Sequence, residues 1–193
     1  MLGLKLPTDP RWVNIVEKNI EEILTDHAYC EQKAASNAIT NIVKFPQYED
    51  VVEAMSDLAK EEMEHFQMVH KELLKRKLKL GRERKDEYIH DLLSFVKKGG
   101  SDEQQFVERM LFGAMVEARS CERFRLLSEN ISDPALRDFY RELMESEARH
   151  YTMFLKFAKK YASKIDVDKR WQEFLEFESC LMLKYGKRET IHG

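Results

Sequence analysis

Cysteine, proline and glycine are scarce in this chain of 193 residues, which contains three, four and seven of them. The three cysteines, Cys30, Cys121 and Cys180, lie far apart with no Cys-x-x-Cys pair, which argues against a disulfide framework and fits a reducing compartment. So few glycines and prolines exclude collagen-like and low-complexity chains. Hydrophobic residues still make up 43% of the chain, enough for a core, which argues against disorder.

Long hydrophobic runs are also missing. No stretch approaches the roughly 18–20 uninterrupted apolar residues of a membrane span, and the opening residues MLGLKLPTDPRW lack the apolar region of a signal peptide. The formal net charge of −3 gives no overall attraction to nucleic acid. We therefore expect a cytoplasmic protein without a membrane partner.

The rare prolines and glycines separate long segments with helical periodicity. Long helices are predicted over residues 11–44, 48–79, 101–130 and 132–161. A shorter helix is expected within residues 86–98, and an accessory helix over residues 168–185. The long helices form two hairpins joined by residues 82–100, which predicts an all-α, ferritin-like four-helix bundle with a long crossover between its second and third helices. We expect one domain over residues 1–193.

Each of the four long helices carries a glutamate inside its apolar stripe. These are Glu31, Glu62, Glu117 and Glu147; His65 and His150 follow the second and fourth one turn later. An isolated buried carboxylate costs several kcal/mol, and four facing one another repel. Two divalent cations would balance the four carboxylates, and two neutral imidazoles would complete the ligand set. The pattern therefore predicts a dinuclear metal site.

The spacing within each half of the chain supports this pairing. Glu31 precedes Glu62 by 31 residues, and Glu117 precedes Glu147 by 30. At a rise of about 1.5 Å per residue, an antiparallel return of this length brings both members of a pair to the same level. In Glu-x-x-His the two side chains share one helix face, so both can bind one metal ion.

Glu-x-x-His alone is a weak motif, because the chain contains two further matches. Glu87/His90 and Glu189/His192 lack a partner glutamate about thirty residues upstream in an antiparallel helix, and we expect both pairs to be solvated. His27 precedes Glu31 by one turn. It is either an ordinary structural histidine or a residue that supports this ligand.

The predicted ligands are carboxylates and imidazoles without a thiolate. This set disfavours structural zinc and copper(I) and suits iron or manganese, and we expect two iron ions with O2 as co-substrate. Glu62 and Glu147 would bridge the ions, and Glu31 and Glu117 would be terminal. From the residues alone, a ferritin-like ferroxidase, a peroxidase or another iron-handling protein, and a helical RNA-binding module with a structural metal, remain open.

Three segments resemble bacterial tRNA hydroxylases of the MiaE type: LPTDPRWVNIVEKNIEEILTDHAYCEQKAASNAI, EEMEHF and EARHYTMF. The resemblance covers essentially the whole chain. It implies an O2-dependent non-haem di-iron monooxygenase that hydroxylates the isopentenyl group of 2-methylthio-isopentenyl-adenosine in tRNA. The family's ligands carry over to Glu31, Glu62, His65, Glu117, Glu147 and His150. In related hydroxylases an acid just before the Glu-x-x-His glutamate supports the opposite histidine; Glu61 holds that place here, and Ser146 the other.

Positive charge is concentrated in residues 71–85, which we call the basic segment (KELLKRKLKLGRERK). Its eight basic and two acidic residues give a net charge of +6, which leaves −9 for the rest of the chain. Cations also suit the end of a helix, but this density favours RNA contact. The expected contacts are Lys75, Arg76, Lys77, Lys79, Arg82, Arg84 and Lys85. Besides tRNA, we expect an external electron donor, a ferredoxin or reductase, because no Gly-x-Gly-x-x-Gly fingerprint is present.

Overall fold

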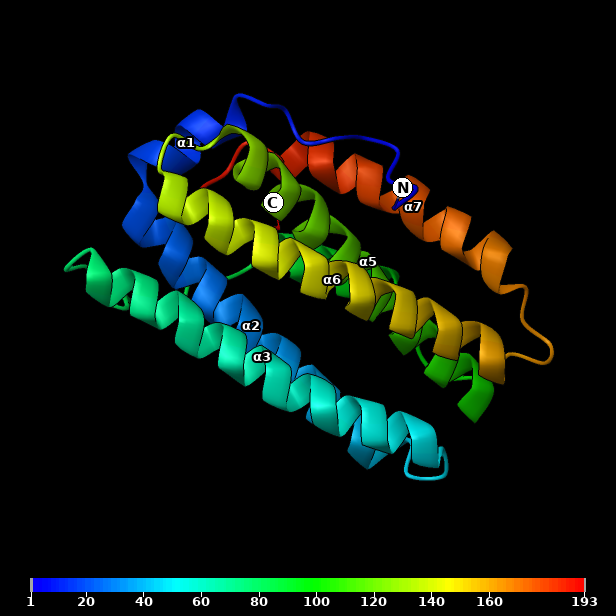
Figure 1. The fold of residues 1–193 in the computed structure, drawn as a ribbon. Helices are drawn as coiled ribbons and strands as arrows, with labels where there is room; N and C mark the ends of the chain where they lie inside the picture. Colours follow the sequence, from blue (N-terminus) through cyan, green and yellow to red (C-terminus); the bar gives the residue numbers. More distant parts are fainter. Residues whose placement is uncertain (1, 193) are drawn as a thin grey trace. The chain divides into compact units, whose positions relative to one another are not determined.

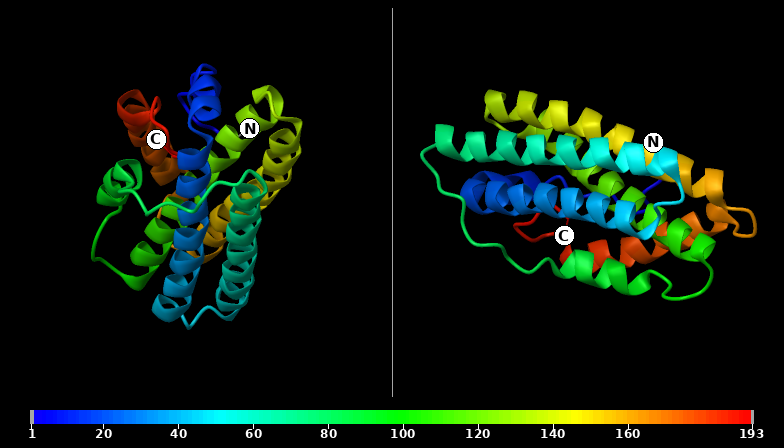
Figure 2. Two further views of the ribbon diagram at one scale, coloured as in Figure 1. Left: turned by 90° about the vertical axis from the view of Figure 1, so that its left-hand side faces the viewer. Right: turned by 90° about the horizontal axis from the view of Figure 1, so that it is seen from below.

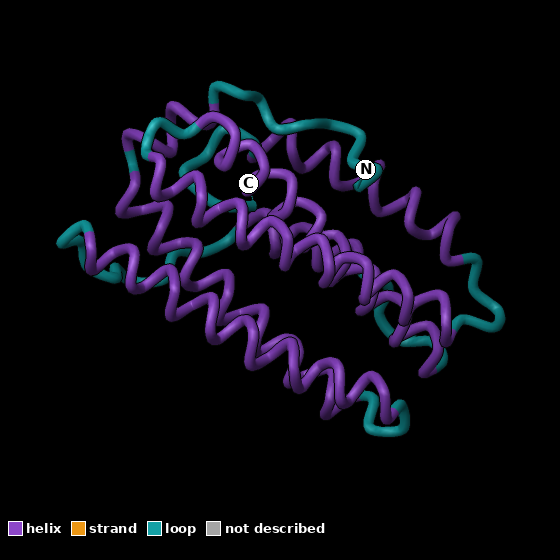
Figure 3. The backbone as a smooth tube through the Cα atoms, in the orientation of Figure 1, coloured by secondary structure: helices purple, strands orange, loops and turns teal. Residues whose placement is uncertain are grey.

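The computed structural model describes residues 2–192, and within them the chain forms seven α-helices and no strand (Figures 1 and 3). The helices are α1 (Trp12–Lys18), α2 (Ile20–Lys44), α3 (Glu49–Lys75), α4 (Glu87–Phe95), α5 (Asp102–Asn130), α6 (Pro134–Tyr161) and α7 (Val167–Tyr185). The predicted all-α class is confirmed. None of these helices has both the length and the hydrophobicity needed to cross a membrane.

These residues form two compact units. Unit 2 contains residues 18–85 and 189–191, and in it α2 and α3 pack side by side as a hairpin (Figure 2). Unit 1 contains residues 2–17, 86–188 and 192. In unit 1, α5 and α6 form the second hairpin, and α7 packs against α4 and α5. Both hairpins were predicted from the sequence.

Side-chain caps begin the later helices close to where the sequence predicts. The Ser101 hydroxyl accepts a hydrogen bond from Gln104 N at 3.2 Å, which begins α5. Asp133 caps α6, whose first residue is Pro134, and Asp166 caps α7. Because caps and apolar periodicity are local signals, α5, α6 and α7 begin within two residues of the predicted positions.

The helix predicted over residues 11–44 is divided in two. Asn19 has φ −135° and ψ 42°, outside the helical region, and separates α1 from α2. In unit 1, Trp12 Nε1 donates to the Arg188 carbonyl at 2.9 Å, and the Arg123 guanidinium lies 4.3 Å from the Trp12 ring centroid. Tertiary contacts of this kind hold α1 in unit 1, so its continuity with α2 is lost.

The helix predicted over residues 48–79 ends early, at Lys75. Lys77 has φ 59°; its N–H donates to the Leu74 carbonyl at 3.0 Å, and Leu78 N donates to the Leu73 carbonyl at 2.9 Å. These two bonds are a Schellman motif, which closes the C-terminus of a helix. A lysine here takes the left-handed conformation usual for glycine, so the sequence carries no glycine to mark this end.

A buried ion network joins the N-terminal segment and α7 to α5 in unit 1. Arg119 donates from Nε and Nη2 to the two oxygens of Glu178 at 2.8 and 3.0 Å, and from Nη1 to Glu122 at 2.9 Å. Thr8 donates to Glu122 from its backbone N–H at 3.0 Å and from its hydroxyl at 2.6 Å. The Tyr88 hydroxyl donates to Glu178 at 3.0 Å. Both carboxylates are therefore paired, as burial requires.

Candidate metal centre

Unit 2 brings three of the predicted ligands together between α2 and α3. Glu31, Glu62 and His65 each offer a ligand atom, and these atoms lie within 4.8 Å of one another. The three residues are at most 5% exposed. His65 Nδ1 lies 3.2 Å from Glu62 Oε2 and 3.7 Å from Glu31 Oε2. A buried imidazole thus sits between two carboxylates.

The electrostatics of this half-site follow from that arrangement. Burial alone would lower the pKa of His65, but Glu31 and Glu62 raise it to about 10. Burial would raise the pKa of Glu31, yet hydrogen bonds with His27 and His65 hold it well below its usual value. Without metal, a proton on His65 therefore supplies the positive charge that the two carboxylates need.

Two further residues of unit 2 lie against this half-site. His27 is fully buried, and its Nε2 is 2.6 Å from Glu31 Oε1, so it contacts the glutamate one turn away. Glu61 lies on the same helix as His65, with its Oε1 3.9 Å from His65 Nε2, and its side chain is one-third exposed (33%).

Unit 1 holds the matching half-site between α5 and α6. Ligand atoms of Glu117, Glu147 and His150 lie within 4.8 Å of one another, and all three residues are buried. His150 Nδ1 is 4.0 Å from Glu147 Oε1. Cys121, one turn from Glu117, hydrogen-bonds the Met144 carbonyl at 3.5 Å, and burial raises the pKa of its thiol to about 11. This thiol stays protonated, so carboxylates and an imidazole are the donors here.

The two half-sites have the same composition: one glutamate from the first helix of a hairpin, and Glu-x-x-His from the second. Each places two carboxylates and one imidazole in a buried position, where uncompensated carboxylates would be costly. Oxygen and imidazole donors without thiolate fit iron or manganese better than structural zinc or copper(I). The residues present therefore fit a pair of such ions.

The two other Glu-x-x-His matches differ from each other. His90 is exposed, as predicted. The prediction that His192 is solvated was wrong, because it is only 4% exposed. Its Nδ1 lies 3.2 Å from Asp86 Oδ2, its Nε2 lies 3.1 Å from Ser120 Oγ, and its ring stacks on Tyr88 at 6.0 Å. Both ring nitrogens have partners, so burial is tolerated; the partners are far away in sequence, so no local pattern indicated it.

The basic segment is only partly available for RNA. Lys75 and Arg76 both bind the buried Glu72 carboxylate, and Arg84 binds the Glu189 carbonyl. The exposed cations that remain from the predicted set are Lys77, Lys79, Arg82 and Lys85.

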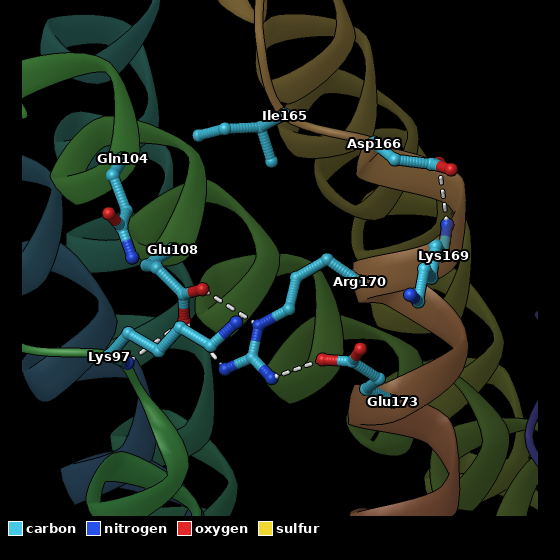
Figure 4. A pocket seen from close by; sticks show the side chains of 8 residues that line it. All are labelled: Lys97, Gln104, Glu108, Ile165, Asp166, Lys169, Arg170 and Glu173. Carbon is cyan, nitrogen blue, oxygen red and sulfur yellow. Dashed lines mark hydrogen bonds and ion pairs between the residues drawn. The ribbon is translucent and has the colours of Figure 1, made fainter.

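Unit 1 also contains a polar pocket that the sequence did not indicate (Figure 4). Its volume is about 290 Å³, and it lies between α5, α7 and the residues before each of them. The lining residues are Lys97, Gln104, Glu108, Ile165, Asp166, Lys169, Arg170 and Glu173. None of the six predicted metal ligands is among them.

Comparisons with known proteins match this chain over nearly its full length. The family model described as tRNA-(MS2IO6A)-hydroxylase (MiaE) matches residues 2–193. A tRNA 2-(methylsulfanyl)-N(6)-isopentenyladenosine(37) hydroxylase from Pseudomonas putida is 36% identical, over 85% of this chain and 78% of that protein. A hydroxylase of the same name from Salmonella typhimurium is 26% identical, over 98% of this chain and 87% of that protein.

A solved structure is similar as well. It is protein 43 with aldehyde deformylating oxygenase activity from Synechococcus, which matches with a TM-score of 0.90 and 31% sequence identity. The match covers 98% of this chain and 95% of that one. The predicted ferritin-like fold class is confirmed.

Proposed function

The chain belongs to the MiaE family of tRNA hydroxylases, and on this premise we propose that it is a di-iron monooxygenase that hydroxylates the isopentenyl group of 2-methylthio-N6-isopentenyladenosine in tRNA. One observation carries the chemistry: a buried Glu and Glu-x-x-His half-site occurs twice, once in each unit. The family match supplies the substrate. The duplicated donor set supplies a place for two ions that activate O2.

Each half-site contains half of the ligands that such a pair of ions needs. The proposed ligands are Glu31, Glu62, His65, Glu117, Glu147 and His150. We assign Glu62 and Glu147 as the bridging carboxylates, and Glu31 and Glu117 as terminal ones. Because neither unit alone has a complete set, both units must act as one domain over residues 1–193. When bound, the iron pair supplies O2 activation for oxidation of the C–H bond.

The chain's own residues prepare the half-site of unit 2 for metal. His27, 2.6 Å from Glu31, orients that carboxylate, as residues behind a metal ligand commonly do. His65 must lose its proton to bind a metal ion, since a ligating imidazole is neutral. Glu61 lies next to His65 and is placed to fix its orientation. Burial of all three ligands keeps bulk water from the carboxylates.

The reaction also needs partners. One oxygen atom enters the product and the other forms water, which consumes two electrons and two protons from outside. A ferredoxin or reductase is the proposed donor, because the sequence carries no flavin or nicotinamide fingerprint. Lys77, Lys79, Arg82 and Lys85 are the proposed phosphate contacts of the basic segment. We place the enzyme in the cytoplasm, where tRNA is found.

Nucleoside mass spectrometry tests the proposal directly. Iron-loaded protein, substrate tRNA, a reductant and isotope-labelled O2 should yield the hydroxylated nucleoside with one labelled oxygen. Metal analysis should give two iron ions per chain, and fewer in Glu31→Ala and Glu117→Ala. Glu87→Ala is the matched control, because it removes the glutamate of a Glu-x-x-His pair whose histidine is exposed.

The alternatives predict different results. Accumulated ferric iron without a modified nucleoside would identify an iron-handling protein. Tight tRNA binding without O2 uptake by the reduced protein would identify an RNA-binding module with a structural metal. Either result would contradict the proposed hydroxylase.

A further inference from the structure

The carboxylates that line the pocket of unit 1 are all engaged (Figure 4). Arg170 donates to both oxygens of Glu108, from Nε at 2.7 Å and from Nη2 at 2.8 Å, and from Nη1 to Glu173 at 2.8 Å. Asp166 accepts a backbone N–H of the first turn of α7 at 2.9 Å, as its N-cap. One guanidinium and one helix N-terminus therefore compensate the negative charge of this pocket.

Two ammonium groups of the same pocket are not compensated. Lys97 and Lys169 are exposed, and neither side chain has an ion-pair partner within 4.0 Å among residues 2–192. The Arg170 hydrogen bond, and after it the charges of Lys97 and Lys169, lower the pKa of Glu173. Both ammonium groups thus act on the interior of the pocket. With the acids already paired, its free charge is positive.

The surroundings of the pocket are basic and well fixed. Residues 156–170 contain six basic and two acidic residues, a local net charge of +4. Lys98 is exposed next to Lys97. The loop before α7 is anchored to the first turn of α5, because Ser163 N and Lys164 N donate to Glu103 at 2.6 and 2.8 Å. This is a second cationic surface, separate in sequence from the basic segment.

We propose that this pocket binds a phosphate group of the tRNA backbone, as a second RNA contact besides the basic segment. The inference rests on the proposed function, since tRNA is the polyanion that this family modifies. A water molecule occupies about 30 Å³ of liquid, so 290 Å³ holds a phosphate and part of its ribose. Lys97 and Lys169 would bind the phosphate as point charges. Ile165 offers the sugar an apolar wall, and the Gln104 amide a further hydrogen-bond donor.

The test compares charge-matched variants by fluorescence anisotropy with labelled tRNA. The variant Lys97→Gln/Lys169→Gln removes the two pocket cations, and Lys18→Gln/Lys44→Gln removes two exposed lysines elsewhere. Each lost phosphate contact reduces the slope of log K against log salt by about 0.7–0.9. Between about 50 and 200 mM salt, wild type should therefore lose roughly tenfold more affinity than the pocket variant.

Three comparisons decide the outcome. The Lys18/Lys44 control should keep the wild-type slope, and Lys97→Arg/Lys169→Arg should keep most of the affinity. Because the replaced side chains are exposed and unpaired, circular dichroism should show unchanged melting. A pocket variant that binds tRNA with wild-type affinity and salt dependence overturns the proposal, as does a control variant that loses as much affinity.

Inorganic phosphate separates the sources of the ligand. If phosphate shifts the NMR signals of the pocket in wild type but the pocket variant still binds tRNA normally, the site serves a free anion and the RNA contact is refuted. Failure of the inference is also distinguishable from failure of the proposed function. Wild type that does not hydroxylate tRNA refutes the function, whereas wild type that does so, with an indifferent pocket variant, refutes only this site.

Discussion

Replacing Arg119 by methionine should destabilise the protein by about 3–5 kcal/mol, the usual cost of removing one partner from a buried ion pair. Arg119 is fully buried and pairs both Glu178 and Glu122. In the variant, Glu178 keeps the Tyr88 hydroxyl and Glu122 keeps Thr8, but neither keeps a direct cation partner of this kind. Methionine fills much of the vacated space, so the loss is mainly electrostatic.

The loss should depend on pH in a defined direction. Burial raises the pKa of Glu178, and Arg119 opposes that rise. Without Arg119 the pKa rises further, and folded Glu178 takes up a proton that the unfolded chain binds only at lower pH. The deficit of the variant should therefore shrink as the pH falls from neutral to about 5.

Urea unfolding followed by circular dichroism measures these free energies. A second change, Glu178→Met, should restore a substantial part of the loss, because it removes the uncompensated charge. Arg141→Met is the matched control, since Arg141 pairs with Asp138 at 3.0 Å on the surface and should cost less than about 1 kcal/mol. The reasoning is refuted if Arg119→Met costs no more than Arg141→Met, or if Glu178→Met restores nothing.

Three further predictions concern the half-sites and the end of α3. Glu62→Ala and Glu147→Ala should each abolish hydroxylation while the circular dichroism stays helical, because metal-free protein loses only carboxylate repulsion; turnover in either variant would show that the wrong glutamates were chosen. Metal-free protein should lose unfolding free energy as the pH rises from 6.5 towards about 10, where His65 gives up its proton, and a flat urea profile would contradict this. Lys77→Gly should raise the unfolding free energy by about 0.5–1 kcal/mol by relieving the left-handed lysine, and a lower urea midpoint would refute that.

Features that depend on short stretches of sequence were predictable. The capping box at Ser101 and the proline at position 134 place α5 and α6 correctly, since caps act over three or four residues. Glu31 and Glu62 meet because a hairpin with a short loop leaves little choice of register. Helical spacing and chain length therefore bring together the acidic and imidazole donors of each half-site.

Features that depend on distant partners were not. Nothing local shows that Trp12 packs with Arg123, which separates α1 from α2, or that His192 finds Asp86 and Ser120. Likewise, a charge count cannot show which cations are already paired. Arg76, tied to Glu72, looks no different in the sequence from its exposed neighbour Lys77.

The order in which the two units occur along the chain has a consequence for synthesis on the ribosome. Residues 18–85 lie inside unit 1 in sequence, so the α2–α3 hairpin emerges whole while its host is unfinished. Thr8 must wait for Glu122, 114 residues later, and Trp12 must wait for Arg188. Early closure of α2 on α3 is therefore expected, followed by late capture of the N-terminal segment once α5 and α7 are available. Ribosomes stalled within α4 should carry a folded α2–α3 hairpin whose leading residues are still cleaved by protease.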